Sequence, residues 1–525
     1  MEIRDADVVI VGGGHNGLTA AAYLGLAGLS VVVLERLDGF GGAAVSAETF
    51  DGVEARLSRY SYLVSLLPQR IIDDLSLPIS LAKRRYSSFT PVPGSNQGLL
   101  IDNLDDNATR ESFEALGDGE DFAAWNDFYA DTATLARALF DGVTDPLVTR
   151  SEAREHVASA SGSDEIWNRF IEKPIGHDIA DRFTHDVVRG VVLTDGLIGT
   201  FAPNMDSELE ANRCFLYHVI GGGTGDWDVP VGGMGAVSGA LTEAARLAGA
   251  QLVASAEVLE ITQNNTVRYE KDGVEHSITT RYVLANSSPR ELARLTGGHS
   301  ISIPGEGAQV KVNMVLTRLP KLLDPQVTPE QAFGGTFHIN ETWSQLDKAY
   351  TSADAGSIPS PLPCEIYCHS LTDPSILGEE LQQSGAHTLT VFGLHTPHRL
   401  TEKYDPDELR ALLEAEVLAS LNSVLAEPIE DLLLRDAHGK PCIETKTTHD
   451  LEEALRLPGG NIFHGPLSWP FAEDTDDLST PAQRWGVDSG IGRIVLCGSG
   501  ARRGGAVSGI AGHNAAMAVL EMEAQ

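Results

Sequence analysis

The chain has 525 residues, of which 42% are hydrophobic and 21% are charged, a balance typical of folded globular proteins. This length exceeds what one hydrophobic core organises, so we expect two or more domains. Acidic residues outnumber Lys and Arg by 74 to 38, and the net charge of −36 argues against nucleic acid or an anionic membrane as a main partner.

The five cysteines are scattered and form no C-x-x-C pair, which favours a reducing compartment over a disulfide framework. Cys364 and Cys368 lie four residues apart in a predicted strand, and we interpret them as a buried thiol pair. Outside the first apolar stretch, no run approaches the ~20 apolar residues of a membrane span. That first stretch lacks a basic leader. We therefore expect a cytoplasmic protein without a transmembrane segment.

The stretch 8–36 is predicted to form a strand, a glycine turn, a helix and a second strand. Gly12, Gly14 and Gly17 stand at G-x-G-x-x-G spacing directly after an unbroken β-branched run. Gly12 permits the tight turn, Gly14 lets a pyrophosphate approach the backbone, and Gly17 lets the helix pack closely on the strand. The N–H groups at the helix N-terminus favour the same anion. Together these features predict dinucleotide binding.

An acid and a glycine pair follow this unit. Glu35 ends the second predicted strand, 23 residues after Gly12, where an acid binds a ribose diol. Arg36 comes next, and we include both among the candidate cofactor ligands. The pair Gly41-Gly42 implies a second close approach of the backbone to the ligand, with an ordinary loop as the alternative.

The middle of the chain is less regular. The segment 60–81 is apolar, and it either lines a substrate channel or forms a core helix with its connection. From 105 to 206, apolar residues recur at helical spacing, which predicts core helices. Residues 215–220 are predicted to form a short strand or a buried turn. The glycine-rich stretch 221–235 lacks G-x-G-x-x-G spacing, so we interpret it as a crossing between domains rather than a nicotinamide site.

The α/β pattern returns twice. A helix over 236–248 and strands up to residue 285 form the first return. The second comes after residue 447, with a strand within 492–500 and a helix over 506–521. Gly509 and Gly512 in that helix cost about 1 kcal/mol each relative to alanine, which indicates that something approaches closely there. We expect the N-terminus of this helix to face an electron-rich or anionic group.

Between these returns the residues predict an antiparallel sheet with helices. Strands are expected over 309–317, 365–369 and 387–394. A helix is expected from Asp405 to about residue 425, with Asp405 as N-cap and Pro406 at its first position.

Several stretches resemble the phytoene-dehydrogenase-like FAD-dependent oxidoreductases, most closely the subgroup named for pyridine nucleotide-disulfide oxidoreductase domain-containing proteins. They are VVIVGGGHNGLTAAAYLGLAGLSVVVLER, the Gly41-Gly42 pair, PVGGMGAVSGAL, AEVLEI, GGNIFHG and VLCGSGARRGGAVSGIAGHNAA. These stretches extend from one end of the chain to the other.

The resemblance implies an α/β fold with a Rossmann-type FAD-binding domain of the glutathione-reductase or amine-oxidase type, assembled from three chain segments, plus an α+β substrate domain. We expect the FAD-binding segments at 1–84, 231–304 and 447–525. The substrate domain is then formed by 85–230 and 305–446.

The resemblance also implies roles for individual residues. Gly12, Gly14 and Gly17 would hold the FAD pyrophosphate, Glu35 the adenosine ribose, and Val258 the adenine through its backbone. The residues expected along the ribityl chain and the isoalloxazine ring are Gly41, Gly42, Gly500, Gly505, Ala506 and Val507.

One departure from the family pattern concerns two arginines. Where members usually have a small residue followed by His-Pro and glycines, this chain has Ala501-Arg502-Arg503. Arg502 and Arg503 would stabilise a reduced anionic ring or bind an acidic substrate. The alternative is that one of them touches the FAD pyrophosphate while the other is solvated.

The leading hypothesis is an FAD-dependent dehydrogenase or desaturase that moves a hydride between a substrate carbon and flavin N5, with an apolar or isoprenoid-like small-molecule substrate. Because there is one nucleotide fingerprint, we expect oxygen, a quinone or a carrier as electron acceptor rather than NADP⁺. We expect no metal, and a homo-oligomer is compatible with the sequence. Five histidines are candidate proton carriers, and His464 is the best placed of them: His177, His185, His395, His398 and His464.

Two alternatives stay open. One is a flavin amine or amino-acid oxidase, in which Arg502 and Arg503 would hold a substrate carboxylate. The other is a non-catalytic binding protein on the scaffold of the Rab GDP-dissociation inhibitors, because a fold alone does not establish catalysis.

Overall fold

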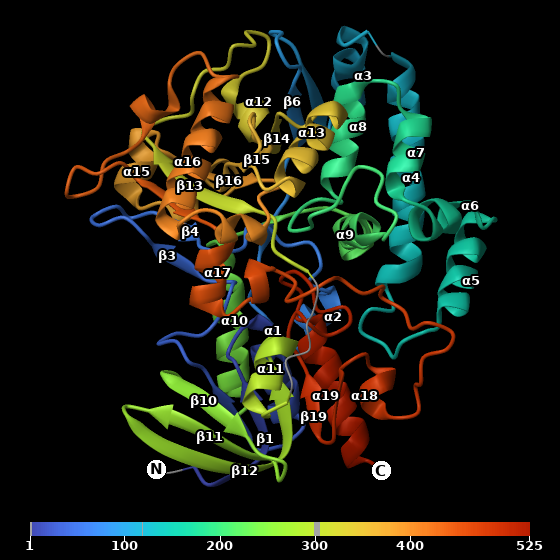
Figure 1. The fold of residues 1–525 in the computed structure, drawn as a ribbon, viewed down its shortest axis with the longest axis vertical. Coiled ribbons are helices and arrows are strands. Elements are labelled where there is room, and N and C mark those ends of the chain that lie inside the picture. The colour runs from blue at the N-terminus through green and yellow to red at the C-terminus, as the bar shows by residue number, and fades with distance from the viewer. Residues whose placement is uncertain (1–2, 118, 299–304) are drawn as a thin grey trace.

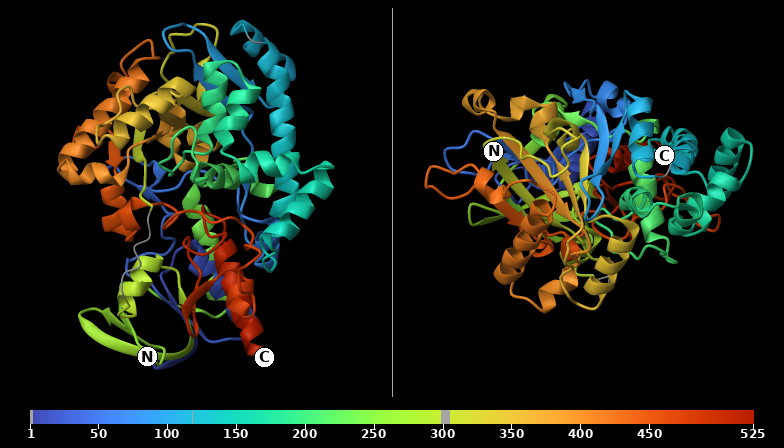
Figure 2. Two further views of the ribbon diagram at one scale, coloured as in Figure 1. Left: turned by 45° about the vertical axis from the view of Figure 1, so that its right-hand side comes forward. Right: turned by 90° about the horizontal axis from the view of Figure 1, so that it is seen from above.

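The computed structural model describes residues 3–117, 119–298 and 305–525, and it contains two large β-sheets in different halves of the molecule (Figure 1). The left view of Figure 2 shows the same division after a turn about the vertical axis. The first and last elements of the chain, β1 and α19, lie in the same half (Figure 1). The first sheet therefore joins parts of the chain that are far apart in sequence.

The first sheet has eight strands, in the order β10-β11-β12-β1-β2-β9, with β19 pairing with β12 and β18 with β19. Three chain segments supply them: β1 (Asp5–Val11) and β2 (Val31–Leu34); β9 (Gln251–Val253), β10 (Ala256–Ile261), β11 (Thr266–Lys271) and β12 (Val274–Ala285); β18 (Asp488–Ile491) and β19 (Ile494–Leu496). β1 runs parallel to β2 and β12, and β12 runs parallel to β19. The α/β class and its three-segment assembly are confirmed.

Both faces of this sheet are covered, as the apolar run in β1 predicts. Val8 and Ile10 pack in the same cluster as helices α1 (His15–Leu26), α10 (Met234–Leu247) and α19 (Ile510–Glu523). Val9 and Val11 point to the opposite face, where α11 (Pro289–Leu295) packs. This alternation follows from the two-residue period of a strand.

The second sheet has seven strands in the order β17-β13-β16-β15-β14-β6-β7. Its strands are β6 (Tyr86–Pro91), β7 (Gly98–Asp102), β13 (Val310–Leu316), β14 (Thr336–Ile339), β15 (Cys364–Tyr367), β16 (His387–Gly393) and β17 (Ile443–Lys446). All neighbours are antiparallel except β14 and β6. Helix α16 (Pro406–Asn422) packs against it, and the Asp405 carboxylate caps that helix by accepting the Asp407 N–H, as predicted.

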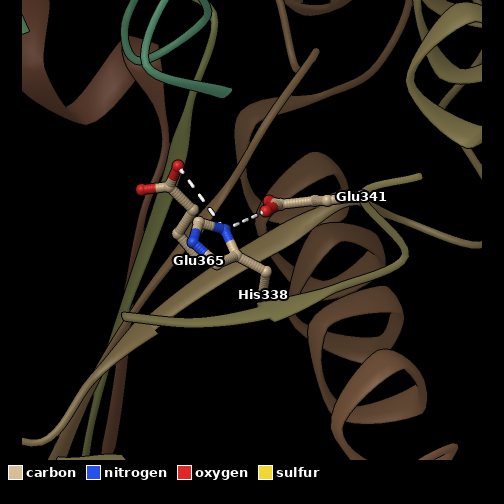
Figure 3. Close-up of side chains that lie close together, drawn as sticks. All are labelled: His338, Glu341 and Glu365. Atoms are coloured by element: carbon tan, nitrogen blue, oxygen red, sulfur yellow. Dashed lines mark hydrogen bonds and ion pairs between the residues drawn. The ribbon is translucent and has the colours of Figure 1, made fainter. Parts of the chain in front are cut away.

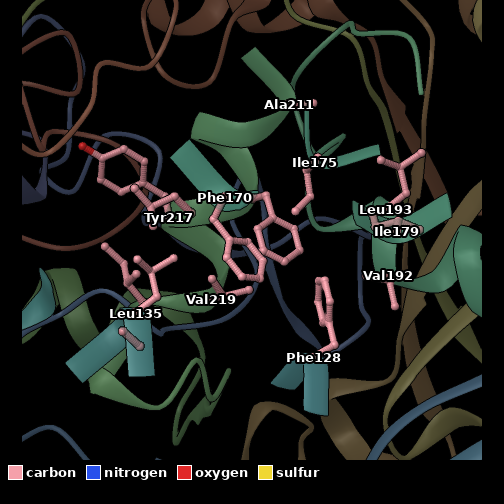
Figure 4. Packing of buried hydrophobic residues seen from close by; sticks show 14 of the residues in the cluster. Phe128, Leu135, Phe170, Ile175, Ile179, Val192, Leu193, Ala211, Tyr217 and Val219 are labelled. Carbon is pink, nitrogen blue, oxygen red and sulfur yellow. The ribbon is translucent and has the colours of Figure 1, made fainter. Parts of the chain in front are cut away.

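Beside this sheet lies a helical region built from the predicted 105–206 segment. Its helices are α3 (Asp106–Ala115), α4 (Gly119–Phe140), α5 (Arg150–Ser161), α6 (Glu165–Trp167), α7 (Ile175–Arg182), α8 (Asp186–Thr194) and α9 (Glu210–Val219). Phe128, Phe170 and Phe215 meet at its centre with ring centroids 5.4–5.9 Å apart. Figure 4 shows part of this packing, with Phe128 and Phe170 labelled.

Two predictions of secondary structure are wrong, one at residues 215–220 and one at the start of the last helix. Residues 215–220 are not a strand or buried turn, because 215–219 form the last part of α9. The closing helix begins at Ile510 rather than Ala506, because Ala506 and Gly509 both have positive φ, which interrupts a right-handed helix.

Cys364 and Cys368 are both buried free thiols.

The domain boundaries expected from sequence remain a proposal. The limits at 84/85, 230/231 and 446/447 each separate elements that belong to different sheets. The limit at 304 lies at the edge of 299–304, outside the described residues. Among the described helices, none is both long enough and apolar enough to cross a membrane.

Candidate active site

One cavity runs between the two sheets and receives side chains from both. Its residues enclose about 1880 Å³ of space, part of which is open to solvent. Ligand sites occur preferentially at interfaces between domains, so this cavity is the candidate ligand site.

The glycine turn of β1 and α1 forms one wall of this cavity. Gly12 and Gly14 line it, as do His15 and Asn16 in the first turn of α1. Gly12 has a φ of +101°, which side-chain-bearing residues rarely adopt. Asn286, directly after β12, also lines the cavity and donates from Nδ2 to the Gly12 carbonyl oxygen at 3.0 Å. The N-terminus of α1 therefore faces the cavity.

The Gly41-Gly42 pair is built into the same wall. The Gly41 N–H donates to the Gly13 carbonyl oxygen at 2.8 Å. A Cβ atom on Gly42 would stand 3.0 Å from the Cα of Gly14, and Gly42 has a φ of +58°. The two glycine loops thus support each other, and Gly42 lines the cavity.

Glu35 is placed as the nucleotide-binding pattern requires. Its side chain is buried at the end of β2, and its two carboxylate oxygens accept the Gly13 N–H at 2.7 Å and the Leu37 N–H at 2.8 Å. Each oxygen keeps a lone pair for a further donor. Arg36 beside it donates to the Ala454 carbonyl oxygen at 2.5 Å.

Several polar atoms at the cavity have no hydrogen-bond partner. They are Asn16 Oδ1, Ser287 Oγ, Gln309 Nε2, His218 Nε2 and His464 Nδ1, and each belongs to a lining residue. Buried polar atoms are normally satisfied, and leaving one unpaired costs about 1–3 kcal/mol. Their concentration along one cavity fits a ligand that carries many donors and acceptors, as a flavin dinucleotide does.

The end of the cavity next to the second sheet is aromatic. We call it the aromatic end and define it by Tyr60, Tyr62, Trp227, Phe392 and Lys311, all of which line the cavity. The rings of Tyr62 and Trp227 are stacked, 5.8 Å apart and 4° from parallel. The ring centroids of Tyr62 and Phe392 lie 4.9 Å apart. These rings present flat apolar walls.

Lys311 is the charged group of the aromatic end. It lies on β13 with a side chain that is 3% exposed, and its Nζ donates to the carbonyl oxygens of Ser58 at 2.7 Å and Ser61 at 2.8 Å. Nζ also lies 5.3 Å from the centre of the Phe392 ring. Burial lowers the pKa of Lys311 to about 7, so this amine changes its charge near neutral pH.

The histidines at the cavity behave differently from Lys311. Burial lowers the pKa values of His15, His218 and His464 to about 4. These imidazoles are therefore neutral at neutral pH. His464 lines the cavity, whereas the other histidines considered from sequence do not: His177, His185, His395 and His398.

The carboxylates at the cavity all belong to the first sheet and its helices. Glu35, Glu257 and Glu291 line it, and protein groups already hold each of them. Among the described lining residues, the aromatic end has no carboxylate and has the cation Lys311; Arg59, which lines the cavity next to Tyr60, is paired with Glu444 at 2.7 Å. The two ends of the cavity thus differ in charge.

Comparison with known proteins agrees with this geometry. Residues 10–69 match the family described as the NAD(P)-binding Rossmann-like domain. An uncharacterized protein of Mycobacterium tuberculosis is 55% identical over 98% of this chain and 97% of its own length. Pyridine nucleotide-disulfide oxidoreductase domain-containing protein 2 of Mus musculus is 30% identical over 98% of this chain and 93% of its own length.

The chain belongs to the pyridine nucleotide-disulfide oxidoreductase domain-containing protein 2 family. An engineered variant of putrescine oxidase has the same overall fold, with a TM-score of 0.58 and 17% identity over the full length of both chains. The oxidoreductase fold expected from sequence is therefore confirmed for this family member. These relatives do not show the specific resemblance to phytoene dehydrogenases that was expected from the sequence.

In this family member, most of the sequence-predicted site residues come together at the cavity. The residues that line it are Gly12, Gly14, Glu35, Arg36, Gly42, Val258, His464, Ala506 and Val507. Gly17 supports the wall from behind, because a Cβ there would stand 2.5 Å from the Gly12 carbonyl oxygen. Gly41, Gly500 and Gly505 do not line the cavity.

Arg502 and Arg503 are also outside the lining, contrary to the position expected for them beside the ligand. Arg502 donates to the Phe471 carbonyl oxygen and pairs with Asp476 at 3.2 Å. Arg503 is buried and donates to three carbonyl oxygens, those of Pro470 at 2.7 Å, Val143 at 3.1 Å and Asp145 at 2.7 Å. Both arginines hold loops of the protein together.

The small residues of the closing helix also have a protein partner. A Cβ on Gly512 would stand 1.9 Å from the Asn16 carbonyl oxygen, and one on Gly509 would stand 3.0 Å from Thr19 Oγ1. The close approach predicted from these glycines is therefore the packing of α19 on α1.

The residues that the sequence reasoning missed are Asn286, Gln309, Lys311 and His218. Two of them carried a usable signal. Asn286 follows the predicted central strand at its carboxyl end, where α/β proteins bind ligands. Lys311 is a single charge inside the apolar strand VKVNMVL.

Proposed function

We propose that this protein is an FAD-dependent oxidoreductase of the dehydrogenase or desaturase type, acting on a neutral, apolar small molecule. The observation that carries the proposal is one continuous cavity with a Rossmann glycine turn and a ribose-type acid at one end and an aromatic wall at the other. Bound flavin would accept a hydride equivalent from a substrate carbon.

Residues of the first sheet would hold the cofactor. The N-terminus of α1 and the Gly12–Gly14 turn are suited to the pyrophosphate, because backbone N–H groups and the helix dipole favour an anion. Glu35 is suited to the adenosine ribose through its free lone pairs. His464, Ala506 and Val507 line the same cavity and would face the more reactive part of the cofactor.

Residues of the aromatic end would orient the substrate and exclude water. The stacked rings of Tyr62 and Trp227, with Phe392, suit a flat or extended apolar molecule. Lys311 would hold or release a proton beside it, because its pKa lies near 7.

The charge of the aromatic end favours this substrate class over a cationic amine. A protonated diamine needs an anionic partner, and among the described lining residues the aromatic end offers Lys311 instead of a carboxylate. Amine oxidation stays the second candidate because the chain shares its fold with a putrescine oxidase variant.

The test is anaerobic titration of the flavin-loaded protein with two panels, one of isoprenoids and polyenes and one of amines and amino acids. Bleaching of the flavin absorbance by the first panel alone is expected. Bleaching by the amine panel alone would contradict the proposed substrate class and favour the second candidate.

We further propose that oxygen, a quinone or a carrier accepts the electrons, because the chain has one nucleotide fingerprint. Mixing the flavin-loaded protein with NADPH in a stopped-flow instrument should leave the flavin oxidised. Rapid reduction by NADPH would overturn this part of the proposal.

A further inference from the structure

Behind the aromatic end lies a buried cluster of titratable side chains. His338 on β14, Glu341 in the turn after it, and Glu365 on β15 point toward one another (Figure 3). All three are 5% exposed or less. Nδ1 of His338 lies 2.5 Å from Glu341 Oε2 and 4.0 Å from Glu365 Oε1.

These three residues offer ligand atoms that suit a metal ion, but their spacing favours a proton. Two ligands at 2.0–2.2 Å from a tetrahedral metal stand about 3.4 Å apart. The separation of 2.5 Å between His338 Nδ1 and Glu341 Oε2 is that of a short hydrogen bond. Oε1 of Glu341 is buried without a partner, so this carboxyl group is incompletely solvated by the protein.

Two tyrosines connect the cluster to the cavity. The Tyr367 hydroxyl donates to Glu365 Oε2 at 2.6 Å. The ring of Tyr62 packs on that of Tyr367, with ring centroids 4.8 Å apart. Tyr62 lines the cavity, whereas Tyr367 lies behind it. Tyr62 at the aromatic end is thus in ring contact with Tyr367, whose hydroxyl group is hydrogen-bonded to Glu365.

The surroundings make Glu365 a stronger base than a carboxylate in water. Burial and the neighbouring Glu341 raise the pKa of Glu365 to about 8, although His338 acts to lower it. Burial raises the pKa of Glu341 well above its usual range. The other titratable or charged groups that interact with the cluster are Asp195, Arg84, Cys214, Cys364, Tyr62 and Tyr367.

We propose that Glu365, coupled to His338 and Glu341, is the acceptor for the proton that the substrate loses in the cavity, with Tyr62 and Tyr367 as the path. The inference rests on the proposed function. When a double bond forms, the substrate loses a hydride to the flavin and a proton to Tyr62. Tyr62 passes its own proton to Tyr367, and Tyr367 passes its own to the Glu365 carboxylate. Both phenols end neutral, and the carboxylate becomes a carboxylic acid.

The first experiment reads the carboxyl group directly and needs neither flavin nor substrate. Infrared spectra of the full chain, recorded between about pH 6 and pH 10, should show a buried carboxylic acid band that disappears with a midpoint near 8. The band should be missing in Glu365→Gln and kept in Glu291→Gln, whose carboxyl group is held by Arg294 and Arg456. An identical band in Glu365→Gln would overturn the assignment.

The second experiment tests the path with variants that keep the ring and the carboxyl group. After a rapid pH jump, the band should appear about tenfold or more slowly in Tyr367→Phe and in Tyr62→Phe. Tyr217→Phe is the matched control, because its buried hydroxyl donates to the Ser468 carbonyl oxygen away from these two tyrosines. Equal rates in Tyr367→Phe and the wild type would overturn the path.

Two further readouts complete the test. With a substrate that bleaches the flavin, the rate of bleaching should rise with pH through about 8 in the wild type and lose this rise in Glu365→Gln. Elemental analysis should find no metal ion that is bound one per chain in the wild type and missing in Glu365→Gln. A metal ion with that behaviour would overturn the assignment of the cluster as a proton site. Since the infrared measurements do not depend on flavin, failure of the proposed function is distinguishable from failure of this inference.

Discussion

Gly42 lies so close to Gly14 that a Cβ atom on Gly42 would stand 3.0 Å from the Gly14 Cα. The two glycine loops therefore form one wall, and a Cβ atom on Gly14 would stand 3.0 Å from Asn286 Nδ2, so a larger side chain there displaces the groups that line the cavity. We predict that Gly14→Val abolishes FAD retention while the chain stays folded, because the φ of −73° at Gly14 is compatible with a side chain. The measurement is flavin absorbance after gel filtration, with circular dichroism for the fold.

The matched control for this variant is Gly239→Val on α10. A Cβ on Gly239 would meet nothing within 4 Å. This control should retain flavin like the wild type. Retention of flavin by Gly14→Val at the wild-type level would contradict the placement of the pyrophosphate.

Asn286 is predicted to support the glycine turn. Removing its amide in Asn286→Ala leaves the Gly12 carbonyl without the donor that now lies 3.0 Å away. A lost hydrogen bond of this kind costs about 1–2 kcal/mol, which corresponds to an FAD affinity roughly 5- to 30-fold weaker. Quenching of FAD fluorescence on titration measures it. Asn422→Ala, at an exposed hydrogen bond to Glu430, should leave the affinity unchanged.

The two arginines are predicted to differ in their contribution to stability. Arg503→Ala removes the donor of the Pro470 and Asp145 carbonyl oxygens, whereas the Val143 oxygen keeps the Asn514 amide at 3.1 Å, so we expect a loss of about 2 kcal/mol or more in the free energy of unfolding. Arg502→Ala should cost about 1 kcal/mol or less and keep FAD, because its ion pair with Asp476 is partly exposed. Urea titrations compare the two variants. Loss of FAD in a folded Arg502→Ala protein would show that this arginine touches the cofactor after all.

Lys311 is predicted to make stability depend on pH. The pKa of Lys311 is about 7 in the folded chain, against an ordinary value of 10.5 for a lysine exposed to solvent, as in the unfolded chain. Between these two pH values the unfolded chain therefore binds more protons than the folded one. Stability from this group therefore rises with pH across that window, by up to roughly 1.4 kcal/mol per pH unit. Lys311→Met has no such group, so the free energy of unfolding of the wild type relative to this variant should increase from about pH 7 to about pH 9.5. A difference that does not change with pH would contradict the assigned titration.

The sequence predicted the parts of the fold that rest on local pattern. The run Val8–Val11, the capped helix after Asp405 and the glycine turn each have a short-range physical cause, and each is present in the structure. The prediction of a strand or turn over 215–220 is wrong because a short apolar run does not distinguish a buried helix end from a strand.

The site was harder to predict where it depends on long-range contacts. Arg502 and Arg503 stand next to cavity residues in sequence, yet backbone carbonyls distant in sequence bind their guanidinium groups. The pairing of β14 with β15 places His338 beside Glu365. The spacing of these residues in the sequence does not predict that contact. Lys311 is identifiable as a lone charge in a strand, but its carbonyl partners come from residues about 250 positions earlier.

The most direct test of the central claim is the flavin content of the purified protein after incubation with excess FAD. Absorbance before and after denaturation, with chromatography of the released compound, should give close to one FAD for each chain. Gly14→Val measured beside it should release almost none. A folded wild-type chain that binds no FAD under these conditions would contradict the account of the cavity as a flavin site.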